Sequence, residues 1–95
     1  MSKLRGLSLF ANVGIAEAYM KDIGVDILLA NEIDEERARF YQTVYPDTHM
    51  VCGDITDDVI RNQIVDEAIK QRIDFVIATP PCQGMSEAGL RLEFD

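Results

Sequence analysis

The sequence predicts an α/β fold in three layers, with helices covering both faces of a parallel sheet. Two observations carry this prediction. Short apolar runs alternate with longer amphipathic stretches along the chain, which is the order of βαβ units. The apolar runs are continuous and do not alternate with polar residues, which is typical of strands buried on both faces of a sheet. The 95 residues are therefore expected to follow the order βαβαβαβ, as one small domain or as part of a larger one.

The first strand and helix are expected within the amino-terminal quarter of the chain. The apolar run Leu7–Phe10 predicts a strand. Residues Gly14–Ile23 predict a helix because their apolar side chains recur three and four positions apart, and Gly24 is a favourable helix stop. The apolar residues at this spacing are Ile15, Ala18, Tyr19 and Ile23.

The second unit begins with the apolar run Asp26–Ala30, which predicts a strand. Asp34 has a side chain suited to cap the helix that follows. This helix is expected to continue to about Tyr45, because Pro46 cannot extend it. The short run Met50–Cys52 then predicts a third strand.

The third helix is expected to begin after Thr56, which can cap it. Asp57 and Asp58 are favourable in its first turn because they face the positive end of the helix dipole. Apolar side chains then recur at helical spacing from Ile60 to Ile73. The run Asp74–Ala78 predicts the fourth strand.

The composition limits the classes of function. The net charge is −8, from 9 basic and 17 acidic residues, which argues against a surface that binds nucleic acid by itself. No apolar run reaches about 18 residues, so no membrane span is expected. The two cysteines fit a reducing compartment, which predicts a cytoplasmic protein. With a single histidine, they offer too few ligands for a zinc site.

Turn formers, carboxylates and a thiol gather where the four predicted strands end. Ligands of open α/β sheets bind beyond the carboxyl ends of the strands, so these segments are candidates for a binding site. The segments are residues 10–14, 31–34, 53–56 and 79–83.

The first two segments suit a nucleotide-like ligand. Gly14 would let a ligand approach the backbone closely, and Asn12 tolerates the left-handed conformation, although a plain tight turn explains both residues equally well. Glu32 follows this turn by about 20 residues, where an acidic residue binds the two hydroxyls of a ribose. The alternative for Glu32 is a charge at a helix N-terminus, which suits Glu35 and Glu36 better.

The third segment suits an adenine ring. Asp54 is placed to accept a hydrogen bond from the adenine amino group, with Ile33 and Ile55 packing on the two faces of the ring. A turn-forming aspartate after Gly53 is an equally good interpretation.

Cys82 is the sharpest candidate for chemistry. It follows Pro80 and Pro81, which stiffen the backbone and would hold the thiol in a defined direction. A thiol held in this way can act as a nucleophile once its thiolate is favoured. A lone cysteine is more commonly a small buried apolar residue, and that interpretation suits Cys52.

At these residues the chain resembles the cytosine-5 DNA methyltransferases. The first motif of that family, usually written F-x-G-x-G-G, is similar to LSLFANVGIAEAYM. The acidic second motif is similar to ANEID, the third to GDIT, and the catalytic Pro-Cys-Gln motif to PPCQGMS. The four occur in family order, at family-like spacing, over nearly the whole chain. Asn12 and Ile15 stand where the first motif has glycines.

The resemblance implies a fold and a cofactor. The fold would be the amino-terminal half of a Rossmann-like methyltransferase domain that binds S-adenosyl-L-methionine. Glu32 would take the ribose hydroxyls, and Pro81 would shape the pocket between the cofactor and the target base. The residues implied to bind the cofactor are Phe10, Asn12, Val13, Gly14, Glu32, Ile33, Asp54, Ile55 and Pro81.

The resemblance also implies the chemistry. Cys82 would attack C6 of a flipped cytosine, which makes C5 nucleophilic enough to take the methyl group. Residues Gln83–Gly89 would belong to a loop that closes over DNA, in which Ser86 would touch a phosphate.

Several parts of the family pattern are not found in these 95 residues. They are the E-N-V motif, whose glutamate protonates N3 of cytosine, the later arginine motif, the target-recognition domain and the closing cofactor segment. We therefore expect a fragment or one subunit of a DNA methylase, inactive alone and completed by a complementary chain or a carboxyl-terminal region. The acidic charge fits, because the recognition domain mainly reads the DNA in this family.

Two alternatives remain open. A branch of the family with the same Pro-Cys motif modifies tRNA, which predicts an RNA substrate. The other alternative is a non-catalytic module for nucleotide binding or assembly that keeps this half of the fold. A half sheet also leaves an unpaired edge at the fourth strand, so the isolated chain is expected to form homo-oligomers, need a partner or be poorly soluble.

Overall fold

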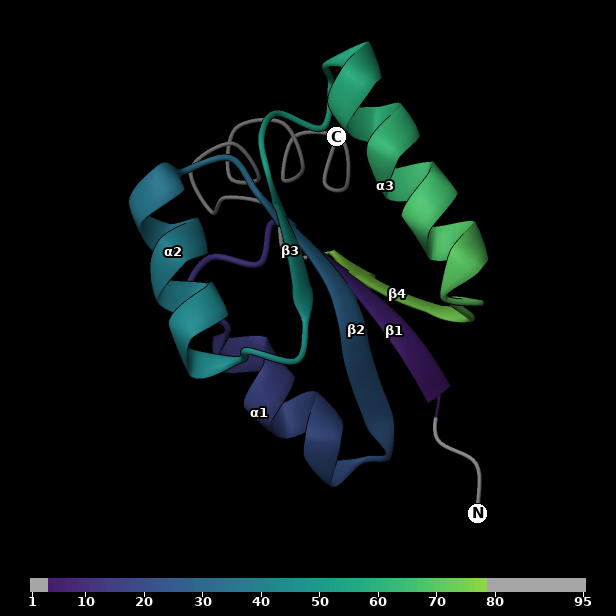
Figure 1. Ribbon diagram of the computed structural model, residues 1–95. Coiled ribbons are helices and arrows are strands. Elements are labelled where there is room, and N and C mark those ends of the chain that lie inside the picture. The colour runs from purple at the N-terminus through teal and green to yellow at the C-terminus, as the bar shows by residue number, and fades with distance from the viewer. Residues whose placement is uncertain (1–3, 79–95) are drawn as a thin grey trace, which may run out of the picture.

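The computed structural model describes residues 4–78. They form a four-stranded parallel sheet, with α1 and α2 on one face and α3 on the other (Figure 1). This confirms the predicted α/β arrangement in three layers. In chain order the elements are β1 (Leu4–Leu9), α1 (Ile15–Asp22), β2 (Val25–Glu32), α2 (Glu35–Val44), β3 (His49–Cys52), α3 (Asp58–Lys70) and β4 (Phe75–Ala78).

The strand order is β3-β2-β1-β4. β1 therefore lies inside the sheet, with Ser8 opposite Ala30 of β2 and Ile77 of β4. The chain runs from β1 outward to β2 and β3, and then returns to the other side of β1. This reversal places a switch point between the carboxyl ends of β1 and β4, where open α/β sheets bind ligands. As predicted, β4 lies at an edge of the described sheet.

Each face of the sheet has its own small core. Leu29 and Ala30 are neighbours on β2, are fully buried, and belong to opposite cores because successive strand residues point to opposite faces. Burial on both faces is thus confirmed for β2. The same prediction is wrong for β4, at the edge of the described sheet, where Val76 is 56% exposed. The buried cluster under α3 is Leu7, Leu29, Val51 and Ile64, and that under α2 is Ala11, Ala30 and Tyr41.

Most element boundaries differ from the prediction by one to three residues, and hydrogen bonding explains two of these differences. β1 begins at Leu4, ahead of the apolar run, because Leu4 and Arg5 pair with Val25 and Asp26 of β2, and Arg5 also binds Asp74, directly before β4. The Arg5 N–H donates to Asp74 Oδ1 over 2.7 Å, and the Asp74 N–H donates to the Arg5 carbonyl over 2.9 Å. α3 is capped by Asp57 and not by Thr56, since the Asp57 carboxylate accepts from the Val59 N–H.

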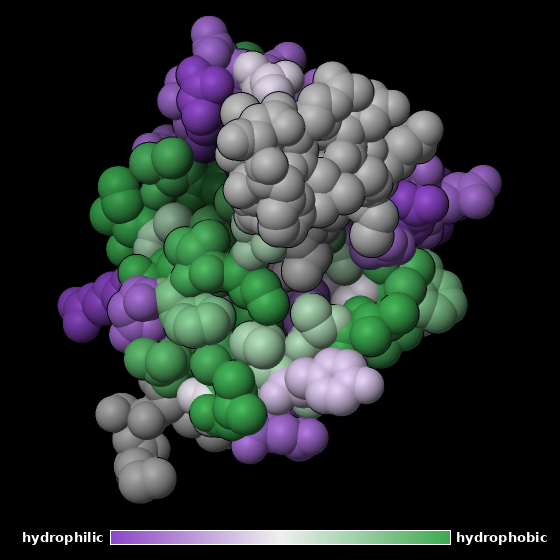
Figure 2. Space-filling model, turned by 180° about the vertical axis from the view of Figure 1, so that it is seen from behind, coloured by the Kyte–Doolittle hydropathy of each residue, from purple (hydrophilic) through white to green (hydrophobic). Residues whose placement is uncertain are grey.

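The apolar stripe of α1 faces outward. Ile15, Tyr19 and Ile23 are 70%, 66% and 68% exposed, whereas the buried residue of this helix is Glu17. Figure 2 shows apolar side chains gathered over the face that is seen from behind the view of Figure 1. The helix therefore presents to solvent the side chains that its periodicity marks as a packing surface. Among the described helices, none is long and apolar enough to cross a membrane.

Candidate functional site

The turn from β1 to α1 has an unusual backbone. Phe10, Asn12 and Gly14 have φ angles of 56°, 57° and 86°, so three left-handed residues occur within five positions. Asn12 tolerates this conformation, as predicted, and takes it where the family motif has glycine. Phe10 is a bulky residue for which a positive φ is a strained choice. Such strain persists only where neighbouring groups hold the backbone, and it is common at functional sites.

Contacts from β2 hold this turn in place. The Ala11 N–H donates to the Asn31 carbonyl over 2.9 Å, and the Gly14 N–H closes back on the Ala11 carbonyl over 3.0 Å. The Asn12 N–H donates to Glu32 Oε1 over 2.7 Å. Groups at the carboxyl end of β2 therefore fix Ala11 and Asn12, and Gly14 is bonded back to the turn itself.

Glu32 lies between two turns at the carboxyl edge of the sheet. It is the last residue of β2 and is 5% exposed. While Oε1 accepts from Asn12, Oε2 accepts from the Asp34 N–H over 2.9 Å. Each carboxylate oxygen has a second lone pair, so these bonds leave acceptor capacity for a ligand. Glu32 thus joins the first two candidate segments, and it is not the exposed helix charge of the alternative interpretation.

Gly14 makes room for two aromatic rings. A Cβ atom at this position would lie 2.9 Å from the Tyr41 ring and still closer to the ring of Tyr45. The Tyr45 hydroxyl donates to the Gly14 carbonyl over 2.7 Å. The glycine is therefore required for packing of α2 on the turn, a reason that has no local signal in the sequence.

Asp54 forms a turn of its own after β3. Its Oδ1 accepts from the Thr56 N–H over 2.9 Å and from the Thr56 hydroxyl over 2.7 Å. These hydrogen bonds hold the pKa of Asp54 below its usual value. Both bonds use Oδ1, so Asp54 fits the turn-forming interpretation and still offers a second oxygen. Ile33 is 60% exposed, whereas Ile55 packs partly against the core under α3.

Asn31 belongs to the predicted segment 31–34, but no role was predicted for its side chain. It is 3% exposed, and its Nδ2 donates to the Val51 carbonyl over 2.8 Å and to the Gly53 carbonyl over 3.0 Å. This amide ties the end of β2 to the turn that carries Asp54. The sequence feature that could have identified Asn31 is a polar residue at the end of an otherwise apolar strand.

Cys52, expected to be buried, is an exposed free thiol. It is the last residue of β3, an edge strand, so little of the protein covers it. Desolvation and the nearby carboxylates, chiefly Glu35, raise the pKa of the thiol. A thiol with a raised pKa is a poor nucleophile at neutral pH, so Cys52 does not compete for the role predicted for Cys82.

Other predicted site residues lie outside the described residues. They are Pro81, Cys82, Gln83 and Ser86, which follow β4 in the sequence. Val13, in contrast, is described within the β1–α1 turn and is partly buried. Within residues 4–78, no group of three or more His, Cys, Asp or Glu side chains is arranged to hold a metal ion.

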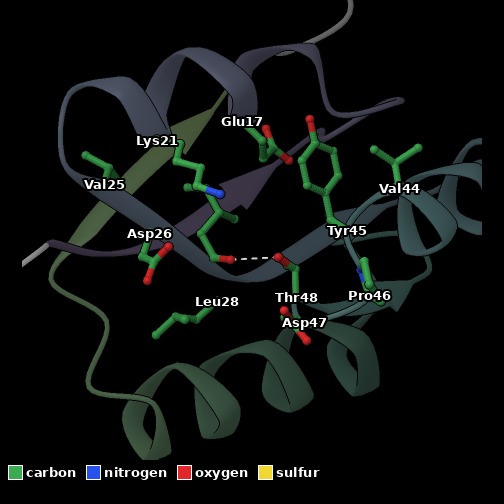
Figure 3. A pocket seen from close by; sticks show the side chains of 11 residues that line it. Glu17, Lys21, Val25, Asp26, Leu28, Val44, Tyr45, Pro46, Asp47 and Thr48 are labelled. Atoms are coloured by element: carbon green, nitrogen blue, oxygen red, sulfur yellow. Dashed lines mark hydrogen bonds between the residues drawn. The ribbon is translucent and has the colours of Figure 1, made fainter.

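A cleft of about 310 Å³ lies away from the carboxyl edge. It is lined by the first half of β2, by α1 and by the segment between α2 and β3, and Figure 3 shows Glu17, Lys21 and Tyr45 along its rim. Thr48 in this segment donates to the Ile27 carbonyl over 2.7 Å, drawn as a dashed line in the figure. The cleft is therefore a feature of the amino half of β2, separate from the candidate site.

Comparisons with known proteins agree on one family. The family model described as C-5 cytosine-specific DNA methylase matches residues 4–95. The Type II methyltransferase M1.HgaI of Avibacterium volantium is 49% identical over 86 residues, which are 90% of this chain and 24% of that protein. The Type II methyltransferase M.NgoPII of Neisseria gonorrhoeae is 35% identical over 83 residues, 87% of this chain and 23% of that protein. The chain thus spans about a quarter of the length of these relatives.

Solved structures agree on the fold. A putative DNA modification methyltransferase encoded within an E. coli prophage matches with a TM-score of 0.68 and 26% identity, over 85% of this chain and 23% of that one. A DNMT2 mutant of Spodoptera frugiperda matches with a TM-score of 0.67 and 22% identity, over 84% of this chain and 23% of that one, and shows the fold alone. With a family model that matches nearly the whole sequence, this chain belongs to the C-5 cytosine-specific DNA methylases.

Proposed function

We propose that the complete enzyme transfers a methyl group from S-adenosyl-L-methionine to C5 of cytosine in DNA, and that residues 1–95 supply the cofactor half of its catalytic domain and the nucleophile. The observation that carries this proposal is the hydrogen bond between the β1–α1 turn, which borders the switch point of the sheet, and Glu32 at the carboxyl end of the neighbouring strand β2. The family description and the Type II relatives favour DNA over RNA as substrate.

The residues at the carboxyl edge fit this cofactor chemically. Gly14, the N-cap of α1, supplies no side-chain cap to the first turn of the helix. The amide groups of that turn are thus suited to bind a carboxylate such as that of the methionine moiety. Glu32 retains lone pairs for the ribose hydroxyls, and Ile33 presents an exposed apolar surface to the adenine ring. Phe10, Asn12, Val13, Asp54, Ile55 and Pro81 complete the proposed set.

Cys82 is the proposed nucleophile. Its thiolate adds to C6 of a cytosine turned out of the duplex, and the electron pair that reaches C5 takes the methyl group that the cofactor supplies. Loss of the C5 proton then expels the thiolate and restores the double bond. Gln83 and Ser86 would contact DNA from the same loop. Since the E-N-V glutamate is not among these residues, we expect the 95-residue polypeptide alone to be inactive.

The proposed setting is the cytoplasm, with DNA and a complementary protein region as partners. The free thiol of Cys52 is consistent with a reducing compartment. We further propose that contact with other protein covers the edge strand β4, because an unpaired edge tends to associate.

A ligand titration of the full-length gene product, with any partner chain that it requires, tests the cofactor site. We expect S-adenosylhomocysteine to bind the wild type and Glu32→Gln to weaken binding about tenfold or more, because a charged acceptor is lost. Glu36→Gln, on the exposed side of α2, is the matched control and should bind normally.

Transfer of a labelled methyl group to DNA tests the nucleophile. Cys82→Ser should abolish transfer while leaving S-adenosylhomocysteine binding intact, and Cys52→Ser should affect neither. Absence of cofactor binding by the wild type, or methylation by Cys82→Ser at the wild-type rate, would refute the proposed function.

A further inference from the structure

Tyr45 connects the end of α2 to the beginning of α1. It is the C-cap of α2, and its hydroxyl donates to the Gly14 carbonyl over 2.7 Å. In Figure 3 its ring stands between the two helices, and its hydroxyl points toward the start of α1. A side chain that lies far from Gly14 in the sequence thus reaches the last residue of the candidate cofactor turn.

Packing fixes the direction of this hydroxyl. The Tyr45 ring lies 4.9 Å from the ring of Tyr41 at an angle of 43°. Tyr41 is fully buried, and both rings are in close contact with Gly14, whose missing side chain leaves the space that they occupy. The ring therefore has little freedom to turn away from the carbonyl to which it donates.

The hydrogen bond from Tyr45 acts on a turn whose backbone is strained. Phe10, Asn12 and Gly14 hold left-handed conformations, and Glu32 fixes the middle of the turn through the Asn12 N–H. The Gly14 carbonyl is at the far end, directly before the first amide groups of α1. Tyr45 thus holds the end of the turn, and the position of this end sets the direction of those amide groups.

We propose that Tyr45 is a positioning residue for the cofactor, whose hydroxyl holds the Gly14 carbonyl so that the first turn of α1 faces the methionine carboxylate. This inference rests on the proposed function of the site. Tyr45 itself does not touch the ligand, since its ring lies in the groove between the helices and borders the cleft beside the first half of β2.

The hydroxyl remains a donor under ordinary conditions. Burial, followed by the charge of Glu17, raises the pKa of Tyr45 above its usual value. Phenylalanine at this position keeps the ring contact with Tyr41 and removes only the donor. Tyr45→Phe is therefore a narrow test, and Tyr19→Phe is the matched control because Tyr19 lies on α1 with 66% of its surface exposed.

The test uses the full-length gene product, with any partner chain that it requires. We expect Tyr45→Phe to raise the Kd of S-adenosylhomocysteine and the KM of S-adenosylmethionine about fivefold, with kcat unchanged, as expected for one lost hydrogen bond. The amide NMR signals of residues 11–15 should shift in the ligand-free variant. Tyr19→Phe should change none of these quantities.

The outcomes separate the inference from the proposed function. If the wild type binds and Tyr45→Phe binds equally well, the inference is wrong and the proposed function stands. If kcat falls together with thermal stability and the turn signals do not move, Tyr45 has only a structural role, and the inference is again wrong. If the wild type does not bind S-adenosylhomocysteine, the proposed function fails first and the inference fails with it.

Discussion

Glu17 is an acidic side chain on the inner face of α1, where a helix in contact with a sheet normally places apolar residues. It is 4% exposed, its Oε1 lies 3.5 Å from the Ser8 hydroxyl, and its Oε2 has no partner among the described residues. Loss of hydration on burial raises the pKa of this carboxyl group above its usual value of 4.5. The nearby Tyr41 has a raised pKa too, through burial and then through Glu17. The folded protein therefore binds the Glu17 proton more tightly than the unfolded chain does.

A pH dependence of stability follows from this. Between pH 4.5 and the raised pKa of folded Glu17, the folded state holds more protons, so the free energy of unfolding falls as the pH rises. Above that pKa the full cost of the buried charge is present.

We expect Glu17→Gln to raise the free energy of unfolding by about 1 kcal/mol at pH 8 and to have little effect below pH 4.5. Urea denaturation across this range measures the difference, with exposed Glu36→Gln as control. Parallel pH profiles for Glu17→Gln and the wild type would contradict the prediction.

Two glycines with the same φ angle allow a matched comparison. Gly14 and Gly24 both have φ of 86°, but a side chain at Gly24 would meet nothing within 4 Å, whereas one at Gly14 would meet Tyr41 and Tyr45. Gly24→Ala should cost about 1 kcal/mol for the left-handed backbone alone. Gly14→Ala should cost about 2 kcal/mol more, because the rings must move. Denaturant unfolding of both variants gives the two costs, and equal costs would show that the ring contact is unimportant.

Local preferences were predictable at this scale, and distant contacts were not. The sequence indicated that Asn12 tolerates a left-handed conformation and that Glu32 would lie at the end of a strand near the first turn. It did not indicate that Gly14 makes room for two tyrosines, because those rings come from a helix beyond the next strand. The burial of Cys52 was predicted wrongly, since exposure at an edge depends on the strand order.

At the scale of elements, all seven strands and helices were predictable, because each combines its own periodicity with a local stop or cap signal. Their ends depend on partners far along the chain. β1 extends back to Leu4 through its pairing with the start of β2 and through the bonds between Arg5 and Asp74, which no local pattern reveals. The exposure of the apolar residues on α1 was equally unpredictable, because periodicity identifies an apolar side of a helix and does not say whether protein covers it.

The cap of α3 can be tested directly. The Asp57 carboxylate accepts from the Val59 N–H over 2.8 Å, whereas the Thr56 hydroxyl donates to Asp54. Asp57→Ala should lower the free energy of unfolding by about 1 kcal/mol, the usual cost of a lost N-cap. Thr56→Ala should cost less, as its bond lies in an exposed turn. Thermal or urea unfolding decides between them, and a larger loss for Thr56→Ala would mean that the cap is assigned to the wrong residue.

At the scale of the molecule, a chain with few basic residues carries extensive apolar surface. The outer stripe of α1, the exposed side of α3 and the edge strand β4 all present large apolar side chains. In a single small domain such surfaces indicate contact with further protein. This agrees with the fact that the chain spans about a quarter of the length of the relatives that it matches.

We predict that the 95-residue polypeptide, expressed alone, self-associates through β4. Light scattering after size-exclusion chromatography should show species larger than a monomer at micromolar concentration. Val76→Lys, which places a charge on the edge strand, should shift the distribution toward monomer. Val65→Lys, on α3 with similar exposure, is the control for a general gain in solubility. A monodisperse wild-type monomer, or an equal effect of both substitutions, would argue against association through the edge.

The position of β1 within the sheet also has a consequence for how the chain folds. β1 is made before the other described strands, yet one of its two neighbours is the last of them, with Gly6 opposite Phe75. Pairs so far apart in sequence close large loops, and proteins dominated by them fold slowly. During synthesis, β1 can pair with β2 early but must leave its other edge open until β4 has left the ribosome. The switch point that creates the ligand site thus also makes it one of the last parts of the described chain to assemble.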